Sequence, residues 1–354
     1  MPENKERKLY LAVDSGGTKV AAILFDEQFR PVAVAKSGSL RANTTPPALV
    51  ESHFLDLMRQ LGLETGARVE EINGTYGANA RKMFADYLDA GKLSFLGEFK
   101  MGLAAAGVFG DGILALSGTG ATVFAGCGGA TATAGGFGAA VSDEGSGYWI
   151  GREAVNAAIR DTESRGPSTG LTEAVTTFLN EQIRGAYEPP FAGPVIPEGS
   201  GRRDALRKAI FSIYRECDKT PVMQIASLVP VVLRTAQEGD AAAREILERG
   251  GRLMAEQVAS AAAALPAASG DSGLKVILAG SVWRGNPFFL NAFRNRMAEL
   301  ELDNEIVVPR FEPVVGVLLA KMNGQGLPEP DGAFAKDYES SRTGFESIPD
   351  FALF

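Results

Sequence analysis

Apolar residues near the start of the chain fall into two short runs separated by a glycine-rich turn. Residues 9–13 (LYLAV) and 20–25 (VAAILF) flank the segment DSGGTK at residues 14–19. Two apolar runs joined by a short turn that contains glycine predict a β-hairpin. A third strand is predicted at residues 32–36. Helical spacing of apolar side chains predicts helices at residues 47–61 and 79–90.

The same layout of apolar run, glycine turn and apolar run occurs a second time further along the chain. Residues 112–116 lead into the turn SGTG at residues 117–120, and residues 121–125 follow it. We interpret the two hairpins as a duplicated supersecondary unit, one copy in each of two domains. Strands grouped with helices in this way predict an α/β fold with mixed sheets. The remaining predicted elements are a helix-rich stretch at 151–256, a strand at 275–279 and a helix at 314–321, where Gly316 leaves room for close packing.

The length of 354 residues also favours two domains with a cleft between them, because single hydrophobic cores rarely grow this large. We predict an amino-terminal domain at residues 1–113, a second domain at 114–325 and a tail at 326–354 that packs on the surface of the first domain. The net charge of −8 argues against nucleic acid as a partner, although a local basic pocket can still bind one nucleotide.

The two cysteines, Cys127 and Cys217, are far apart and predict neither a disulfide framework nor a zinc site. The first eight residues are polar, and no apolar stretch reaches the roughly 18 residues that a membrane span needs. We therefore expect a cytoplasmic protein without a membrane partner. The single histidine, His53, is expected to be an ordinary surface residue of the predicted helix at 47–61.

The first glycine turn is the leading candidate for chemistry. Consecutive glycines allow positive φ angles and let backbone N–H groups approach phosphate oxygens. Asp14, at the end of the preceding strand, is a candidate magnesium ligand, because magnesium retains most of its waters and needs few carboxylates. Taken alone, DSGGTK is equally typical of a tight hairpin turn. The second turn, SGTG, favours phosphate binding, because two such turns can hold a triphosphate between two domains.

Five segments occur in the order found in one known family: VDSGGTK (13–19), LSGTGA (116–121), GGFGAAVSDEGSGYWIG (135–151), TAQEGD (235–240) and ILAGSVW (277–283). Over roughly residues 9–323 the chain resembles the N-acetylglucosamine kinase and BadF/BadG/BcrA/BcrD ATPase family. This family belongs to the superfamily of actin, sugar kinases and heat-shock chaperone ATPases. The resemblance implies two ribonuclease-H-like, actin-like ATPase domains.

The resemblance also implies roles for individual residues. The phosphates would contact Gly16, Gly17, Thr18 and Lys19 from one domain and Gly118, Thr119 and Gly120 from the other. The adenine and ribose pocket would include Ala236, Gly280 and Ser281. The sugar would contact Asn43, Gly77, Glu98, Gly136, Phe137, Gly138 and Asp143.

Three of these residues have competing structural interpretations. Ala236 is also typical of a helix end, and Phe137 of a core aromatic residue. Asp143 lies in DEGS, a helix start signal in which Asp or Ser caps the helix, although we favour a sugar contact for Asp143.

The position of the catalytic base departs from the family pattern. Where the family has an aspartate that takes the proton from the sugar hydroxyl, this chain has Gly97-Glu98-Phe99-Lys100. Glu98 is the best-aligned carboxylate, and its extra methylene extends its reach by about 1.5 Å. Three alternatives remain: Glu98 is the base for a shifted substrate, Asp143 is the base, or the protein is a weak kinase.

Together these features predict an ATP- and magnesium-dependent kinase that phosphorylates a hydroxyl of a small amino sugar, with N-acetylglucosamine and its 6-phosphate as the leading substrate and product. A homodimer is the expected assembly. One alternative is an ATPase that drives a partner protein, although the two cysteines show no iron–sulfur arrangement. The other alternative is a sugar-sensing protein with weak turnover.

Overall fold

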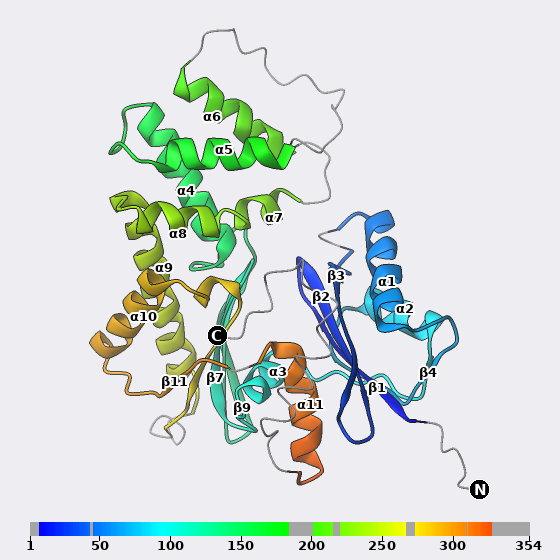
Figure 1. Ribbon diagram of the computed structural model, residues 1–354. Helices are drawn as coiled ribbons and strands as arrows, with labels where there is room; N and C mark the ends of the chain where they lie inside the picture. The colour runs from blue at the N-terminus through cyan, green and yellow to red at the C-terminus, as the bar shows by residue number, and fades with distance from the viewer. Residues whose placement is uncertain are drawn as a thin grey trace, which may run out of the picture. The chain divides into compact units, whose positions relative to one another are not determined.

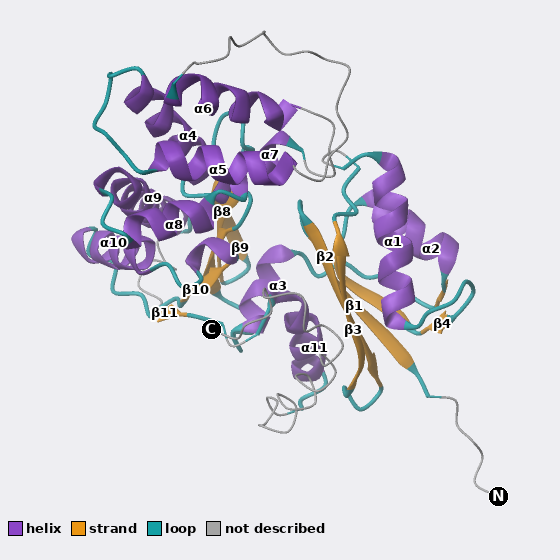
Figure 2. Cartoon of the chain, turned by 45° about the horizontal axis from the view of Figure 1, so that its top comes forward, coloured by secondary structure: helices purple, strands orange, loops and turns teal. Residues whose placement is uncertain are grey.

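The computed structural model describes residues 7–42, 45–183, 201–214, 220–266, 273–309 and 311–327 of the chain (Figure 1). The chain divides into two compact units. Unit 1 combines the residues up to Gly112 with the segment from Val307 onward, and unit 2 runs from Ile113 to Ile306. Each unit contains a mixed β-sheet with helices (Figure 2). The predicted α/β class with mixed sheets is therefore confirmed.

Unit 1 is built on a four-stranded sheet in the order β3-β2-β1-β5. Strands β1, β2 and β3 are antiparallel neighbours, whereas β5 runs parallel to β1. The strands of unit 1 are β1 (Leu9–Ser15), β2 (Lys19–Asp26), β3 (Pro31–Gly38), β4 (Arg68–Val69), β5 (Glu71–Thr75) and β6 (Asp89–Ala90). Its helices are α1 (Pro47–Leu61), α2 (Ala78–Tyr87), α3 (Glu98–Ala105) and α11 (Pro313–Gly324).

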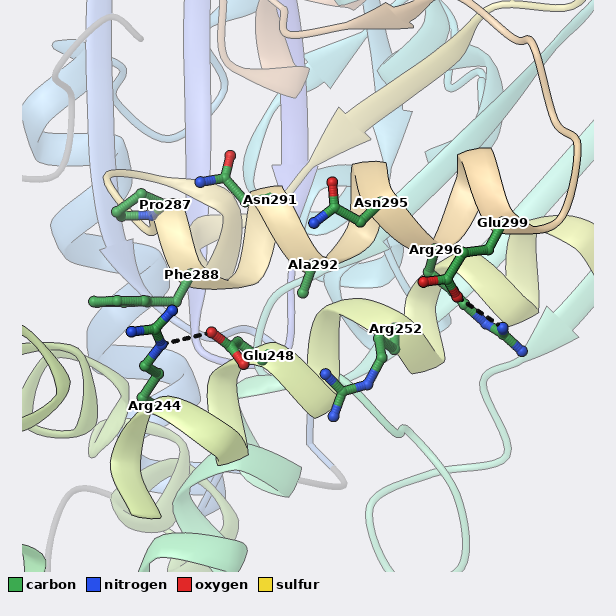
Figure 3. Close-up of a pocket in the computed structure, with 10 residues that line it drawn as sticks. All are labelled: Arg244, Glu248, Arg252, Pro287, Phe288, Asn291, Ala292, Asn295, Arg296 and Glu299. Carbon is green, nitrogen blue, oxygen red and sulfur yellow. Dashed lines mark hydrogen bonds and ion pairs between the residues drawn. The ribbon is translucent and has the colours of Figure 1, made fainter. Parts of the chain in front are cut away.

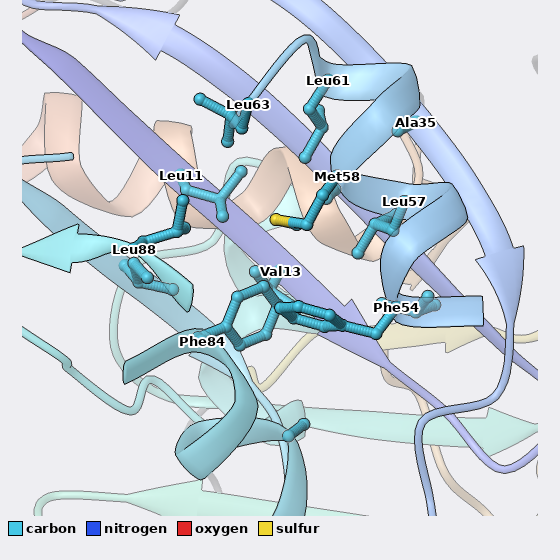
Figure 4. Close-up of a cluster of buried hydrophobic side chains, with 14 of the residues drawn as sticks. Leu11, Val13, Ala35, Phe54, Leu57, Met58, Leu61, Leu63, Phe84 and Leu88 are labelled. Carbon is cyan, nitrogen blue, oxygen red and sulfur yellow. The ribbon is translucent and has the colours of Figure 1, made fainter. Parts of the chain in front are cut away.

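Side chains on the two faces of this sheet form two separate cores, as strand alternation requires. On one face, Leu11 and Val13 of β1 pack with Phe54 and Met58 of α1 and with Phe84 of α2 (Figure 4). On the other face, strand residues pack with helices α3 and α11; this second core includes Ala12, Ala21, Ile23, Val34, Met101, Val314 and Leu318.

Helix α11 corrects the predicted domain boundaries. The second domain was predicted to extend to residue 325, but α11 packs on α3 and β1 of unit 1. A Cβ atom on Gly316 would lie 2.0 Å from the carbonyl oxygen of Met101, so this glycine permits close helix packing, as predicted. The ion pair between Lys321 and Glu71, 2.5 Å long, also joins α11 to β5. Of the predicted tail, residues 328–354 lie outside the described residues.

Unit 2 contains a five-stranded sheet in the order β11-β10-β7-β8-β9. Strand β10 runs parallel to β7, and β8 and β9 are antiparallel. The strands are β7 (Gly112–Ser117), β8 (Ala121–Cys127), β9 (Ala130–Gly135), β10 (Val276–Ala279) and β11 (Ile306–Val307). The helices are α4 (Gly147–Thr162), α5 (Leu171–Ile183), α6 (Arg202–Phe211), α7 (Pro221–Ala226), α8 (Val229–Gln237), α9 (Ala241–Ala263) and α10 (Pro287–Glu299).

Both predicted hairpins and the helix at 47–61 are confirmed. The helix predicted at 79–90 ends earlier, at Tyr87, because Asp89 and Ala90 pair with β4 as a short strand. Strand β9 was not predicted. Its residues, ATATAG, are small and only partly buried, so they lack the run of large apolar side chains that marks the predicted strands. Among the helices that the structure describes, none combines the length and apolar character needed to cross a membrane.

Candidate functional site

The first glycine turn closes the hairpin between β1 and β2. The N–H group of Gly16 donates to the carbonyl oxygen of Lys19 over 2.9 Å, and the hydroxyl of Ser39 donates to the carbonyl oxygen of Gly16 over 3.0 Å. The expectation of positive φ angles is wrong here, because neither Gly16 nor Gly17 has one. Phosphate binding at Gly16 would compete with the hydrogen bond that closes the turn.

Charged side chains surround the end of β1. Burial and, next in size, the negative charge of Glu98 raise the pKa of Asp14 to about 6. Lys19 and Arg41 act in the opposite direction and lower it. The first turn therefore lies in a compact arrangement of opposite charges, which is typical of functional sites.

Glu98 lies in the first turn of α3, directly after Gly97. Its Oε1 atom is 3.1 Å from Nη2 of Arg41, and each side chain is about one third exposed. Arg41 also donates from Nε to the carbonyl oxygen of Ser15 over 3.4 Å. Arg41 thus connects the candidate base to the first glycine turn. Arg41 was not among the predicted site residues, although it stands in the segment LRAN, close to the predicted sugar ligand Asn43.

The predicted sugar ligands of unit 1 are only partly placed. Gly77 precedes α2 and follows the end of β5. Because β5 runs parallel to β1, its carboxyl end lies at the same edge of the sheet as Asp14. Ligands of open α/β sheets bind at such edges. Asn43 lies outside the described residues.

The second glycine turn, between β7 and β8, is held by the start of helix α4. The N–H group of Gly147 donates to the carbonyl oxygen of Gly118 over 2.7 Å, and that of Tyr148 to the carbonyl oxygen of Thr119 over 3.2 Å. Within the turn, Gly118 N–H donates to the carbonyl oxygen of Gly120 over 2.9 Å. Neither glycine of this turn has a positive φ angle either. The distinctive segment DEGSGYWIG therefore supports the second turn structurally.

Ser146, not Asp143, caps helix α4, since its hydroxyl accepts from the N–H group of Trp149 over 3.1 Å. Asp143 is buried, and its φ of 62° is uncommon for a residue other than glycine. Its Oδ1 atom accepts from the N–H group of Gly138 over 3.0 Å. A Cβ atom on Gly120 would lie 2.8 Å from Oδ2 of the same carboxyl group. Burial raises the pKa of Asp143. The Asp143 side chain thus supports the second turn, and its contact with a sugar remains a prediction.

Gly280 brings the predicted adenosine loop against the second turn. It follows β10, which is paired in parallel with β7, and has a φ of 104°. A Cβ atom there would lie 2.0 Å from the carbonyl oxygen of Ser117, so only glycine fits. Ser281 begins a short 3-10 helix, and Nε1 of Trp283 donates to the carbonyl oxygen of Ala115 over 3.1 Å. The structure therefore places Gly118 and Gly280 together at one edge of the sheet.

Two other residues of unit 2 had alternative interpretations. The side chain of Phe137 is 81% exposed, so the alternative of a core residue is wrong. Phe137 stands between Gly136 and Gly138, both of which have positive φ angles. Ala236 is buried near the end of α8, which agrees with the helix-end interpretation and leaves its adenine contact a prediction.

His53 is more than an ordinary surface residue of α1. Its ring is half-buried, and Nδ1 lies 3.1 Å from the carbonyl oxygen of Ser39. A Cβ atom on Gly38 would lie 2.2 Å from the ring. His53 therefore packs against the segment that supplies Ser39 to the first glycine turn. The helical pattern did not reveal this contact, which depends on the course of the chain after β3.

A surface groove of about 430 Å³ lies between helices α9 and α10 of unit 2 (Figure 3). Arg244 pairs with Glu248 at 2.7 Å, and Arg296 pairs with Glu299 at 3.0 Å. None of the predicted site residues lines this groove. Its arginines therefore provide no support for the assigned nucleotide or sugar contacts.

Comparison with known proteins identifies the family. The family model described as the BadF/BadG/BcrA/BcrD ATPase family matches residues 11–320. The chain belongs to this family. A curated relative, the N-acetylmuramic acid/N-acetylglucosamine kinase of Clostridium acetobutylicum, is 27% identical over 184 residues. That match covers 49% of this chain and only 60% of the relative, so it spans less than two thirds of the relative's length.

Solved structures of similar fold include two candidate N-acetylglucosamine kinases. The protein from Chromobacterium violaceum is 24% identical with a TM-score of 0.62, over 88% of this chain and 98% of that one. The protein from Porphyromonas gingivalis is 17% identical with a TM-score of 0.56, over 89% of this chain and 99% of that one. At these identities the likeness concerns the fold, and it agrees with the predicted actin-like ATPase architecture.

Proposed function

We propose that this member of the BadF/BadG/BcrA/BcrD family is an ATP- and magnesium-dependent kinase that phosphorylates a hydroxyl group of an amino sugar. N-acetylglucosamine, converted to its 6-phosphate, is the leading substrate. The observation that carries the proposal is the contact of Arg41 with both Glu98, 3.1 Å away, and the carbonyl oxygen of Ser15 beside the first turn, 3.4 Å away. Burial and, next, the charge of Glu98 raise the pKa of Asp14 at the end of the same strand. The similarity to kinases of N-acetylated amino sugars supports the substrate class.

In this proposal the two carboxylates have different roles. Glu98 accepts the proton of the attacking sugar hydroxyl, and Arg41 orients Glu98 through the ion pair at Oε1. Lys19, next to the first turn, offsets negative charge on the phosphates. The second turn, held by α4 and Gly280, contributes a preformed surface for the nucleotide.

The residues around Asp14 fit a magnesium ion that is held largely through water. Among the described residues, no group of three or more His, Cys, Asp or Glu side chains is arranged as a metal site. Magnesium commonly uses one or two protein carboxylates together with waters and phosphate oxygens. Asp14 would hold such an ion, which would neutralise charge on the phosphates when bound.

A coupled assay of ADP release with a panel of hexoses and amino sugars tests the proposal. ADP release that depends on an amino sugar, together with a phosphorylated sugar detected by mass spectrometry, is the expected result. ADP release independent of every sugar would instead support an ATPase that acts on a partner protein. Sugar binding without ADP release would support a sensor.

A further inference from the structure

Four residues form one row across the sheet of unit 1. Thr75 on β5 is the register partner of Asp14 on β1, Asp14 is the partner of Ala21 on β2, and Ala21 is the partner of Lys36 on β3. Residues directly opposite one another on neighbouring strands project from the same face of a sheet. Ala21 belongs to the core that packs against α3 and α11, so the whole row lies on that face.

Lys36, at one end of this row, has its counter-charge at Glu312, the residue directly before α11. Its Nζ atom lies 3.2 Å from Oε1 of Glu312, and the two side chains are only 5% and 11% exposed. This buried pair offsets the charge of Lys36 locally. The other end of the row presents a carboxylate, Asp14, beside a hydroxyl group, Thr75.

The hydroxyl group of Thr75 is buried but lacks the hydrogen-bond partner that buried polar groups usually have. Thr75 is 6% exposed, and its Oγ1 atom has no hydrogen-bond partner among the described residues. Buried hydroxyl groups nearly always have a partner, in the protein or in ordered water or a ligand. Valine has the same shape and favours strands equally well, so packing alone does not require a hydroxyl here.

The position of Thr75 indicates where the missing partner belongs. Thr75 is the last residue of β5, and Asp14 is the last but one of β1. The two strands are parallel, so both side chains lie at the carboxyl edge of the sheet, next to the first glycine turn. A hydroxyl oxygen accepts a hydrogen bond from a water molecule bound to a cation as readily as from protein.

We propose that Thr75 is a positioning residue of the magnesium site at Asp14, and that its Oγ1 atom accepts a hydrogen bond from a water of the ion's hydration shell. This inference rests on the proposed function, because the metal assignment of Asp14 is part of that function. Magnesium dehydrates reluctantly, so groups that orient its waters contribute to its affinity and placement. Partners outside the first coordination shell commonly contribute tenfold to a hundredfold in metal affinity.

The test is a Mn²⁺ titration followed by electron paramagnetic resonance, with the full chain, saturating ADP and no sugar. Thr75→Val is expected to weaken Mn²⁺ binding about tenfold. Its thermal stability without metal is expected to match or exceed that of the unsubstituted protein, because the hydroxyl has no internal partner. Thr75→Ser retains a hydroxyl group and is expected to restore most of the affinity.

Thr45→Val is the matched control. Thr45 is 5% exposed and its hydroxyl also has no partner among the described residues, but it precedes α1 and is outside the row. Mn²⁺ affinity in Thr45→Val is expected to be unchanged. Unchanged affinity in Thr75→Val, or a large loss of its metal-free stability, would overturn the proposal.

Asp14→Asn in the same titration distinguishes failure of this inference from failure of the proposed function. If Asp14→Asn weakens Mn²⁺ binding and Thr75→Val does not, the role of Thr75 alone is refuted. If Asp14→Asn leaves binding unchanged, the metal assignment within the proposed function is wrong, and the role of Thr75 is wrong with it. Because the titration contains no sugar, its outcome is independent of whether the protein proves to be a kinase or an ATPase.

Discussion

The two glycine turns look alike in sequence but are stabilised in different ways. The second turn is held by packing and backbone hydrogen bonds: α4 donates to its carbonyl groups, Asp143 lies against Gly120, and Gly280 approaches Ser117 closely. The first turn is surrounded by charges, with Asp14 and Glu98 opposed by Lys19 and Arg41. The second turn is thus fixed mainly by close packing, while the first turn lies among charges of both signs, an environment in which the proposed phosphate and metal contacts can be tested.

At the first glycine turn, which is surrounded by charges, the strongest test is Glu98→Gln. If Glu98 is the base, kcat falls on the order of a hundredfold or more, because a neutral amide does not accept the proton. The affinity for ADP, measured by calorimetry, is expected to change little. Glu98→Asp provides the control. It introduces the aspartate that the family has at this position, and it is expected to retain more activity than Glu98→Gln. Unchanged turnover in Glu98→Gln would remove Glu98 from this role.

At the second glycine turn, which is held by packing, the strongest test is Gly280→Ala. The added methyl group would clash with the carbonyl of Ser117 at a φ that other residues rarely adopt. We expect a loss of about 3 kcal/mol or more in the free energy of unfolding, measured by urea denaturation. Gly118→Ala is the matched control, because a Cβ atom there has nothing within 4 Å. Gly118→Ala should weaken ADP binding with little change in stability; equal destabilisation by both variants would contradict the distinction.

Asp14→Asn tests the cost of burying a charged carboxylate, next to the charge of Glu98, at the first turn. A rise in the pKa of Asp14 from 3.8 to about 6 means that its ionisation destabilises the fold by at most about 3 kcal/mol. The folded protein binds this proton more tightly, so the cost is absent below pH 3.8, grows as the pH rises and is complete above about pH 6. Asp14→Asn is therefore expected to raise the melting temperature at pH 7.5 but not at pH 3.5. An equal effect at both pH values would contradict the electrostatic account.

The smallest expected effects on stability and on KM concern Phe137, an exposed residue of the segment that leads to Asp143. Phe137→Ala should change the free energy of unfolding by no more than about 0.5 kcal/mol, because the ring is 81% exposed. If the ring packs on a sugar face, KM for the sugar rises by roughly threefold to tenfold. Val141→Ala, which alters a 79% exposed side chain in the same segment, is the control and should leave KM unchanged. If Phe137→Ala leaves KM for the sugar unchanged, the predicted contact between Phe137 and the sugar is refuted.

Local pattern was sufficient for the hairpins and for helix α1, because alternation and helical spacing directly reflect which side chains are buried. It also located both glycine turns and the close packing at Gly316. The role of His53 and the partner of Glu98 were missed, because each depends on a contact with the segment after β3. Positive φ angles were expected at Gly16 and Gly17 but are absent there, whereas other glycines, among them Gly97 before α3 and Gly280 after β10, have them.

Local spacing and motif order were enough to predict the family, the mixed α/β fold class and the order of the candidate nucleotide segments. Three features became visible only in the folded chain: α11 returns to unit 1, Asp143 supports the second turn, and Thr75 and Asp14 are register partners. These features depend on contacts between residues far apart in the chain. Strand register and helix docking create such contacts, and no local pattern encodes them.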